Sequence, residues 1–208
     1  MFYPFARAIF WFFFRVLWRW KIEGLEKFPS EGPVIVVANH ISVWDPIVIG
    51  TALPRPVYFM AKEELFRFPI FRNLLLRLHA FPVKRGQPDR SAIRRALEVL
   101  DSGQVLGVFP EGSRSKTGEL QKPLPGVAMI ALKARVPVIP VACIETDRIL
   151  KKGSWFKSFK VRIGEPVEYS EYYEQRLNTI NLEIVSQRIM EQISWLLEED
   201  KKQADLSD

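Results

Sequence analysis

Short apolar runs that end in polar loops recur along the chain, and this alternation is the feature that most constrains the fold. The runs cover residues 34–38, 57–60, 80–83, 105–109 and 136–141, and segments with helical patterns separate them. Short apolar runs bounded by glycine, proline or polar residues are typical of buried strands. Strands that alternate with helices predict an α/β fold, in which helices flank a mixed, largely parallel sheet.

The segments between the runs predict the helices. Asp89 is a suitable N-cap for a helix that ends near Leu100, because Ile93, Leu97 and Leu100 share one face. Further helices are expected over residues 47–53, 66–78, 127–134 and 182–196. We also expect a polar connector over residues 24–33, a hairpin or pair of strands at the sheet edge over 155–167, and a charged C-terminal tail over 201–208.

The first apolar run leads into the segment Asn39-His40-Ile41-Ser42-Val43-Trp44-Asp45. Loops at the ends of core strands are where α/β proteins carry reactive groups. His40 can take up a proton, and Asp45 can accept a hydrogen bond from the other ring nitrogen and stabilise the imidazolium. The same two residues would also suit a local hydrogen bond without any catalytic role.

Cations follow three other runs. The run 105–109 leads into Pro110-Glu111-Gly112-Ser113-Arg114-Ser115-Lys116, while Lys62 and Arg85 follow the runs 57–60 and 80–83. A loop with a glycine, hydroxyls and cations could bind a phosphate, although a solvated turn uses the same residues. The net charge of +6 likewise favours anionic partners.

Metal and disulfide chemistry find little support in the composition. The chain has two histidines, His40 and His79, and one cysteine, Cys143, which lies in an apolar run. An internal disulfide is therefore excluded, a reducing compartment is expected, and we expect no metal site.

The N-terminal segment, residues 1–22, is rich in aromatic side chains but carries three arginines. The uncharged stretches between the arginines are too short for a membrane-spanning helix, which needs about 20 apolar residues. We expect an interfacial helix that lies in the cytoplasmic leaflet, with monotopic or peripheral attachment. Its expected membrane contacts are Phe10, Trp11, Phe13, Phe14 and Trp18. The alternative is a helix packed on the protein's own core.

Asn39-His40-x4-Asp45 followed by Phe109-Pro110-Glu111-Gly112-Ser113-Arg114 resembles the paired signature of the glycerolipid acyltransferases, and specifically of the bacterial 1-acylglycerol-3-phosphate acyltransferases. Two further blocks resemble the same family: the segments 62–65 and 81–85, which lie between the signatures, and the run 136–141. The blocks occur in the expected order from Val34 to about Val141, so residues 23–200 are interpreted as an acyltransferase domain.

The resemblance implies a role for each matching residue. His40 would be the general base, oriented by Asp45, and transfer would be direct, without an acyl-enzyme. Lys62, Arg85 and Arg114 would hold the phosphate of the acceptor, with Glu111 and Gly112 in the same phosphate-binding loop. Backbone amides near residues 136–139 are the candidates for an oxyanion hole. No cofactor is implied beyond an acyl-carrier-protein or coenzyme A thioester as co-substrate.

Ser113 stands where threonine is common in the family, and His79 stands where glycine is frequent. The expected reaction is acylation of the sn-2 hydroxyl of lysophosphatidic acid at an anionic membrane surface. Another lyso-lipid acceptor, such as a lyso-ornithine lipid or a lysophospholipid, is one alternative, and a non-catalytic module that binds anionic lipid is a second. A Ser42-His40-Asp45 triad is disfavoured because both Ser42 and His40 lie in one short loop, and a nucleic-acid partner is not expected because no recognition motif is present.

Overall fold

The computed structural model describes residues 2–151 and 157–206. In these residues a seven-stranded sheet has the order β1-β7-β6-β2-β5-β3-β4. Neighbouring strands are parallel except for β6 and β7, which are antiparallel. The predicted α/β fold with a mixed, largely parallel sheet is therefore confirmed. The strands are β1 (Lys21–Glu23), β2 (Val34–Ala38), β3 (Val57–Lys62), β4 (Phe81–Val83), β5 (Val105–Val108), β6 (Val138–Ile144) and β7 (Lys160–Ile163).

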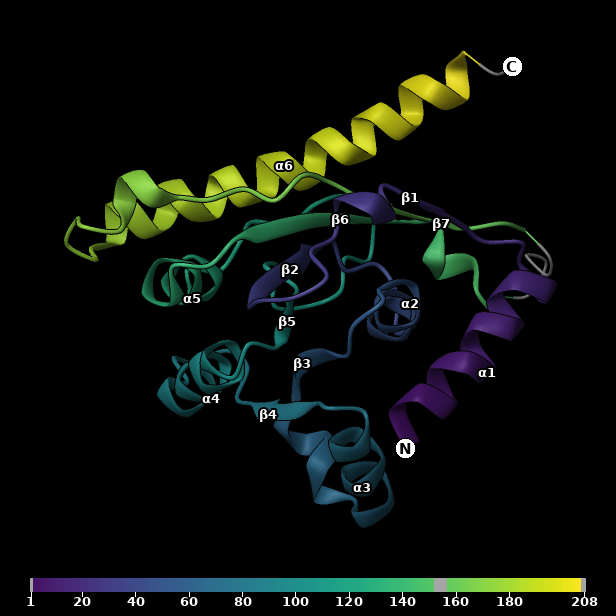
Figure 1. Cartoon of the computed structure of the whole chain (residues 1–208), viewed down its shortest axis with the longest axis horizontal. Helices are drawn as coiled ribbons and strands as arrows, with labels where there is room; N and C mark the ends of the chain where they lie inside the picture. The colour runs from purple at the N-terminus through teal and green to yellow at the C-terminus, as the bar shows by residue number, and fades with distance from the viewer. Residues whose placement is uncertain (1, 152–156, 207–208) are drawn as a thin grey trace.

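Helices cover both faces of the sheet (Figure 1). They are α1 (Phe2–Leu17), α2 (Asp45–Ala52), α3 (Pro69–Arg77), α4 (Arg90–Asp101), α5 (Gly126–Ala134) and α6 (Thr179–Asp205). Side chains of α4, α5 and α6 form one buried cluster with the sheet, and side chains of α1 and α2 form a second. Helix α3 has no buried residue. The central strand β2 is buried at every position because both faces are covered.

The register of the sheet brings the polar loops to one edge. Val37 lies beside Val108 in the parallel pair β2/β5, and Ala38 lies beside Val141 in β2/β6. Lys62, the last residue of β3, lies beside Val83 of β4. Loops that follow the carboxyl ends of parallel strands meet at the same edge, so His40, Lys62, Arg85 and the loop after β5 converge there.

The N-terminal helix has two different faces. Trp11 and Phe13 are each 47% exposed, whereas Phe14 and Trp18 are 1% and 4% exposed. The predicted membrane contacts at Phe14 and Trp18 are therefore wrong, because these side chains pack in the protein's own core. The Phe14 ring contacts Phe159 at 5.2 Å between centroids. Phe10 is partly buried and lies near Trp44.

Several other expectations about elements need correction. The connector expected over residues 24–33 is preceded by an unexpected strand, β1, which takes the sheet edge beyond β7. A single strand, β7, forms in the described part of the region where a hairpin was expected; residues 155 and 156 of that region lie outside the described residues. The expected charged tail continues helix α6 as far as Asp205.

Ion pairs account for strand β1 and for the extension of α6. The Arg162 side chain of β7 donates from Nε to Glu23 of β1 at 2.8 Å, which ties the short edge strand to its neighbour. Lys160 forms an ion pair with Asp200 of α6. Pairing between distant residues of this kind keeps charged segments ordered that local composition assigns to loops.

The N-cap of α4 provides a test of the folded state. Asp89 accepts hydrogen bonds from the backbone N–H groups of Ser91, Ala92 and Lys84. The Ser91 hydroxyl hydrogen bond, followed by that from the Lys84 backbone, lowers the pKa of Asp89 to about 2 from an ordinary 3.8. Since the folded pKa is the lower one, the stabilisation is present above the ordinary pKa and is lost as the pH falls toward the folded pKa.

We expect Asp89→Ala to lower the free energy of unfolding by about 1 kcal/mol near neutral pH, because a helix N-cap is removed. The difference from wild type should shrink at acidic pH between the two pKa values. Urea unfolding followed by circular dichroism measures the free energy of unfolding at neutral pH and at an acidic pH between the two pKa values. Asp89→Asn is the control that keeps an N-cap. A loss of the same size at both pH values would contradict the charged-cap interpretation.

Candidate active site

His40 and Asp45 form a buried hydrogen-bonded pair at the carboxyl end of β2. The Nδ1 atom of His40 lies 2.8 Å from Oδ2 of Asp45, and the two residues are 7% and 0% exposed. An ionised Asp45 fixes the proton of His40 on Nδ1, which leaves Nε2 as the nitrogen that can accept a proton. The pair therefore has the geometry that a general base and its orienting carboxylate require.

The Asp45 carboxylate receives four hydrogen bonds. Besides His40, the backbone N–H groups of Ile41 and Ser42 donate to Oδ2 at 2.8 Å each. The hydroxyl of Thr146, just after β6, donates to Oδ1. Asp45 is also the first residue of α2, where the helix dipole favours a negative charge. These contacts compensate for the burial of the carboxylate and hold it in one orientation.

A stack of rings holds the His40 side chain from one face. The imidazole ring lies 4.0 Å from the ring of Phe109, and Phe109 lies 5.7 Å from Phe59, with near-parallel planes in both pairs. Gly107 makes this stack possible, because a Cβ atom there would meet the Phe59 ring at 2.2 Å. The position of the imidazole is therefore set by packing as well as by its hydrogen bond.

Two backbone contacts join the His40 loop to the loop after β5. The N–H of His40 donates to Oε1 of Glu111 at 2.8 Å, and the N–H of Ser115 donates to the carbonyl of His40 at 2.7 Å. The other carboxylate oxygen of Glu111 accepts from the backbone and side-chain N–H groups of Gln121. The two loops, about seventy residues apart in sequence, are thus in direct contact.

Glu111 does not have the geometry of a phosphate ligand, which corrects that prediction. Its carboxylate is buried and its two oxygens accept hydrogen bonds from His40 and Gln121, so it braces the loop. An anionic side chain would also repel a phosphate. Gly112 has a φ of 69°, and a Cβ atom there would meet Leu124 at 2.4 Å. The glycine is therefore needed for the shape of the loop.

The three predicted phosphate-binding cations lie at the same sheet edge and are exposed. Partial desolvation lowers the pKa of the Arg85 guanidinium, and the charge of Arg114 lowers it further, although Glu64 acts in the opposite direction. Arg85 and Arg114 follow β4 and β5, the strands on either side of β3, at the same edge of the sheet. Lys62 forms an ion pair with Glu64 at 3.2 Å. Within residues 2–151 and 157–206, no ion pair within 4 Å involves Arg85 or Arg114.

The predicted oxyanion donors lie at the wrong edge of the sheet. Val138 pairs with Ile35, five residues before His40, which corresponds to about 16 Å along a strand. The N–H of Val138 also donates to the carbonyl of Val167. Backbone amides of residues 136–139 therefore cannot stabilise an oxyanion beside His40. It is the carboxyl end of β6, at Cys143, that adjoins the site.

Neither Ser42 nor Cys143 is arranged as a nucleophile. The Ser42 hydroxyl accepts a hydrogen bond from the Trp44 N–H, and Nδ1 of His40 is already directed to Asp45. Burial, and secondarily the charge of Asp45, raises the pKa of the Cys143 thiol well above its usual range. A thiol in that state is unreactive.

His79 has a structural position. Its φ is 62°, a left-handed conformation that explains why glycine would also fit there. Its ring lies 5.1 Å from that of Tyr3 and 4.6 Å from that of Tyr58, and desolvation lowers its pKa. The residue connects α1 to the start of β4, at the edge of the sheet opposite His40.

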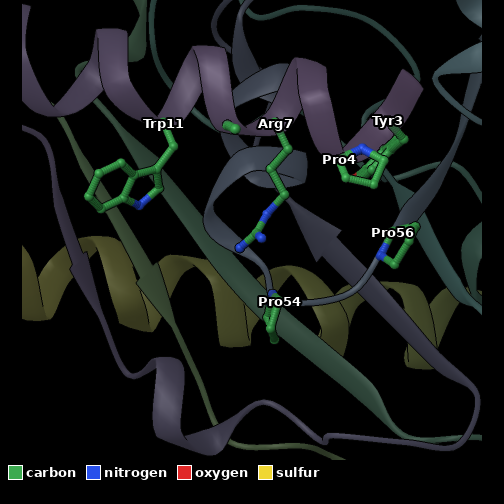
Figure 2. Close-up of a pocket in the computed structure, with 7 residues that line it drawn as sticks. Tyr3, Pro4, Arg7, Trp11, Pro54 and Pro56 are labelled. Atoms are coloured by element: carbon green, nitrogen blue, oxygen red, sulfur yellow. The ribbon is translucent and has the colours of Figure 1, made fainter. Parts of the chain in front are cut away.

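A groove of about 450 Å³ lies between α1 and the α2–β3 connection (Figure 2). Arg7 points into it from α1, and Trp11 and the prolines Pro4, Pro54 and Pro56 line the groove around it. Its Nε donates to the carbonyl of Thr51, in the last turn of α2. Since Asp45 begins α2 and Thr51 lies near its end, the groove is at the far end of that helix from His40.

Sequence reasoning missed three residues that build the site. Asn39 exchanges two hydrogen bonds with the backbone of Cys143, at 2.9 and 2.7 Å, and so joins β2 to β6 beyond their paired residues. Thr146 orients Asp45, and Phe109 supports His40. Asn39 adjoins His40 in the recognised motif, but no local pattern in the sequence predicts the long-range contact of Thr146.

Comparisons with known proteins agree with this geometry. The acyltransferase family model matches residues 19–144. A 1-acyl-sn-glycerol-3-phosphate acyltransferase of Bacillus subtilis is 31% identical over 82% of this chain and 86% of its own length. The enzyme of the same name from Streptococcus pneumoniae is 32% identical over 97% of this chain and 75% of its own length.

A solved structure shows the same fold. The crystal structure of the 1-acyl-sn-glycerophosphate acyltransferase PlsC from Thermotoga maritima matches with a TM-score of 0.70 and 28% identity, over 95% of this chain and 78% of that one. The family match covers both signature loops and the strands that carry them. The chain therefore belongs to the acyltransferase family, among the enzymes of the 1-acyl-sn-glycerol-3-phosphate acyltransferase type.

Proposed function

We propose that this protein transfers a fatty acyl group from an acyl-carrier-protein or coenzyme A thioester to the sn-2 hydroxyl of 1-acylglycerol 3-phosphate, which yields phosphatidic acid. The observation that carries the proposal is the contact between the two loops: Ser115, next to Arg114, donates to the carbonyl of His40 at 2.7 Å. A proton acceptor and a cation that suits phosphate are thereby held at one sheet edge. Glycerol phosphate presents a hydroxyl and a phosphate at a comparably short separation.

His40 acts as the general base in this mechanism. Its Nε2 takes the proton of the acceptor hydroxyl while the hydroxyl oxygen bonds to the thioester carbonyl carbon. The tetrahedral intermediate then expels the thiolate, which recovers the proton from the imidazolium. The new ester and the free thiol are the products, and His40 returns to its neutral state. The ionised Asp45 stabilises the imidazolium between the two proton transfers.

Lys62, Arg85 and Arg114 bind the phosphate of the acceptor. A planar guanidinium can donate two parallel hydrogen bonds to phosphate oxygens, and a lysine adds a point charge. Because Arg85 and Arg114 follow the strands on either side of β3, a dianionic ligand at the end of β3 would be attracted by both positive charges. This arrangement favours a phosphate-bearing acceptor over a lyso-ornithine lipid. The buried His40–Asp45 pair favours an enzyme over a module that only binds lipid, because lipid binding alone does not require a proton acceptor.

The acceptor reaches the site from an anionic membrane surface, and α1 attaches the protein to the cytoplasmic leaflet. Its outer face exposes large apolar side chains, among them Phe5, Trp11, Phe12, Phe13 and Val16. The inner face packs on α2, where Tyr3 donates to the carbonyl of Gly50 at 3.1 Å. Within the described chain, no helix is long and apolar enough to cross a bilayer. A helix with one packed and one exposed apolar face suits insertion parallel to the surface.

Purified His40→Ala and Asp45→Asn variants test the chemistry. We expect each to lower kcat on lysophosphatidate by between about 10² and 10⁴, the usual contribution of general-base catalysis. His79→Asn is the matched control, because asparagine tolerates the left-handed backbone at that position. Wild-type transfer that His40→Ala retains in full would refute the general-base assignment. Wild-type protein that transfers to no acceptor in a panel of lyso-lipids would refute the enzymatic proposal.

Phosphate recognition is tested with Arg114→Ala. We expect the KM for lysophosphatidate to rise by at least about tenfold, while the KM for the thioester changes little, because one charge-assisted contact to the acceptor is lost. Lys116→Ala, in the same exposed loop, is the control. Equal increases in both KM values would contradict a specific role in binding the phosphate.

The contact of Thr146 with Asp45 gives a test of orientation without any change at the reacting atoms. We expect Thr146→Val to lower kcat by between about 10- and 100-fold at nearly unchanged KM for the acceptor, because Asp45 loses a buried donor and the imidazole shifts. Thr146→Ser restores the hydroxyl and should restore most of the rate. Failure of serine to restore it would indicate that packing, and not the hydrogen bond, accounts for the loss.

A further inference from the structure

An apolar segment without any buried side chain lies between β3 and β4. It consists of the 3-10 helix η2 (Glu63–Arg67) and α3 (Pro69–Arg77), and neither contains a buried residue. Large apolar side chains on a helix are normally packed against a partner. The exposed ones here are Leu65 at 43%, Phe68 at 62%, Ile70 at 82%, Phe71 at 55%, Leu74 at 41% and Leu76 at 48%.

After Glu63 and Glu64, which begin η2, every charged residue of this segment is basic. No aspartate or glutamate occurs from Leu65 to Pro88, whereas Arg67, Arg72 and Arg77 lie within the apolar stretch. The three arginines are exposed. The N-terminal helix shows the same composition, since the chain from Phe2 to Trp20 is also free of acidic residues. In a chain with 24 acidic residues, two such segments are a clear local bias.

The two acid-free segments meet in space. The Arg77 guanidinium lies 5.8 Å from the centroid of the Phe2 ring, and Tyr3 contacts His79, two residues beyond α3. Figure 1 shows α1 and α3 on the side of the molecule away from α6. Helix α6 is different in charge: six of its residues are acidic and three are basic. The molecule is therefore polarised, with an apolar and cationic side formed by α1 and α3.

We propose that the segment Leu65–Leu76 is a second membrane-inserted element, which together with α1 attaches the protein to an anionic bilayer. The inference rests on the proposed function, because that function requires a lipid acceptor. A bilayer suits the surface better than a protein partner would, since exposed aliphatic and aromatic side chains interspersed with exposed arginines match the boundary between acyl chains and phosphates.

The placement of this segment gives it a role in substrate access. Lys62 precedes it by three residues and Arg85 follows it at the exit of β4, so two of the proposed phosphate-binding cations flank it. Val43, in the His40 loop, and Leu124, which packs beside Gly112, are also exposed, at 57% and 53%. Insertion of the segment would hold the cations at the depth of the headgroups, so that the acceptor moves sideways into the site.

The experiment compares Ile70→Glu with Ile180→Glu in the full chain. Ile180 lies on α6 and is 67% exposed, so it matches Ile70 in side chain and in accessibility. Flotation with phosphatidylcholine vesicles, with and without phosphatidylglycerol, measures the partition coefficient. We expect Ile70→Glu to lower it by at least about tenfold, a change of about 1.4 kcal/mol, and Phe12→Glu on α1 to act similarly. Ile180→Glu should stay within about twofold of wild type.

Two further measurements keep the result unambiguous. A fluorophore attached to Phe71→Cys should be quenched by spin-labelled lipids on vesicle binding; the chain's own cysteine, Cys143, is buried and so is not labelled. Circular dichroism verifies that each variant is folded. Vesicle binding by Ile70→Glu equal to that of wild type, together with an unquenched fluorophore at position 71, would overturn the proposal. An increase in KM for an acyl-carrier-protein donor with unchanged vesicle binding would overturn it in favour of a carrier-docking surface.

The assay also separates this inference from the proposed activity. On a short-chain lysophosphatidate dissolved as monomers, Ile70→Glu should retain the wild-type kcat, because the reacting groups are untouched. A loss of kcat on that soluble acceptor equal to the loss on vesicles would place the segment in the catalytic machinery and overturn the proposal. If wild type transfers no acyl group to any lysophosphatidate, the proposed activity fails, while the vesicle measurements still test the insertion of the segment.

Discussion

The buried carboxylate of Asp45 is the interaction on which the site depends. A carboxylate with no exposed surface is costly unless every oxygen is hydrogen-bonded. Here the donors come from the His40 ring, from two backbone N–H groups of the same loop and from Thr146. Thr146 follows β6, about one hundred residues further along the chain. Folding of β6 beside β2 is therefore a condition for the orientation of Asp45 and of the His40 ring that it holds.

The charged side chains and the His40–Asp45 pair lie at the same edge of the sheet, where the parallel strands end. Parallel strands deliver a proton acceptor and three cations to one side, while the carboxylate of Glu111 is turned inward to brace the loops. Exposed apolar side chains continue over α3 and α1, which meet where the Arg77 guanidinium approaches the Phe2 ring. Under the proposed function, a single orientation of the protein on a bilayer serves attachment, phosphate binding and proton transfer, because the elements assigned to these three tasks lie next to one another.

Sequence patterns predicted the sheet, most helices and the His40–Asp45 pair, because these features are local: apolar runs, an N-cap and a motif within a few residues. Contacts between distant residues were not predictable in this way. Strand β1 depends on the pairing of Glu23 with Arg162, and the burial of Phe14 depends on Phe159. An aromatic residue on an amphipathic helix looks the same in sequence whether it faces lipid or core, which is why two membrane contacts were assigned wrongly.

Gly107 shows how a residue without a side chain limits variation at the catalytic centre. It lies inside β5, and the ring of Phe59 occupies the volume that its Cβ would need. The Phe59 ring supports Phe109, which in turn supports His40. A methyl group added at Gly107 would displace the Phe59 ring, and this displacement would shift Phe109 and then the imidazole. Substitution at this buried strand position is therefore constrained by the position of the His40 ring, which is two side chains away.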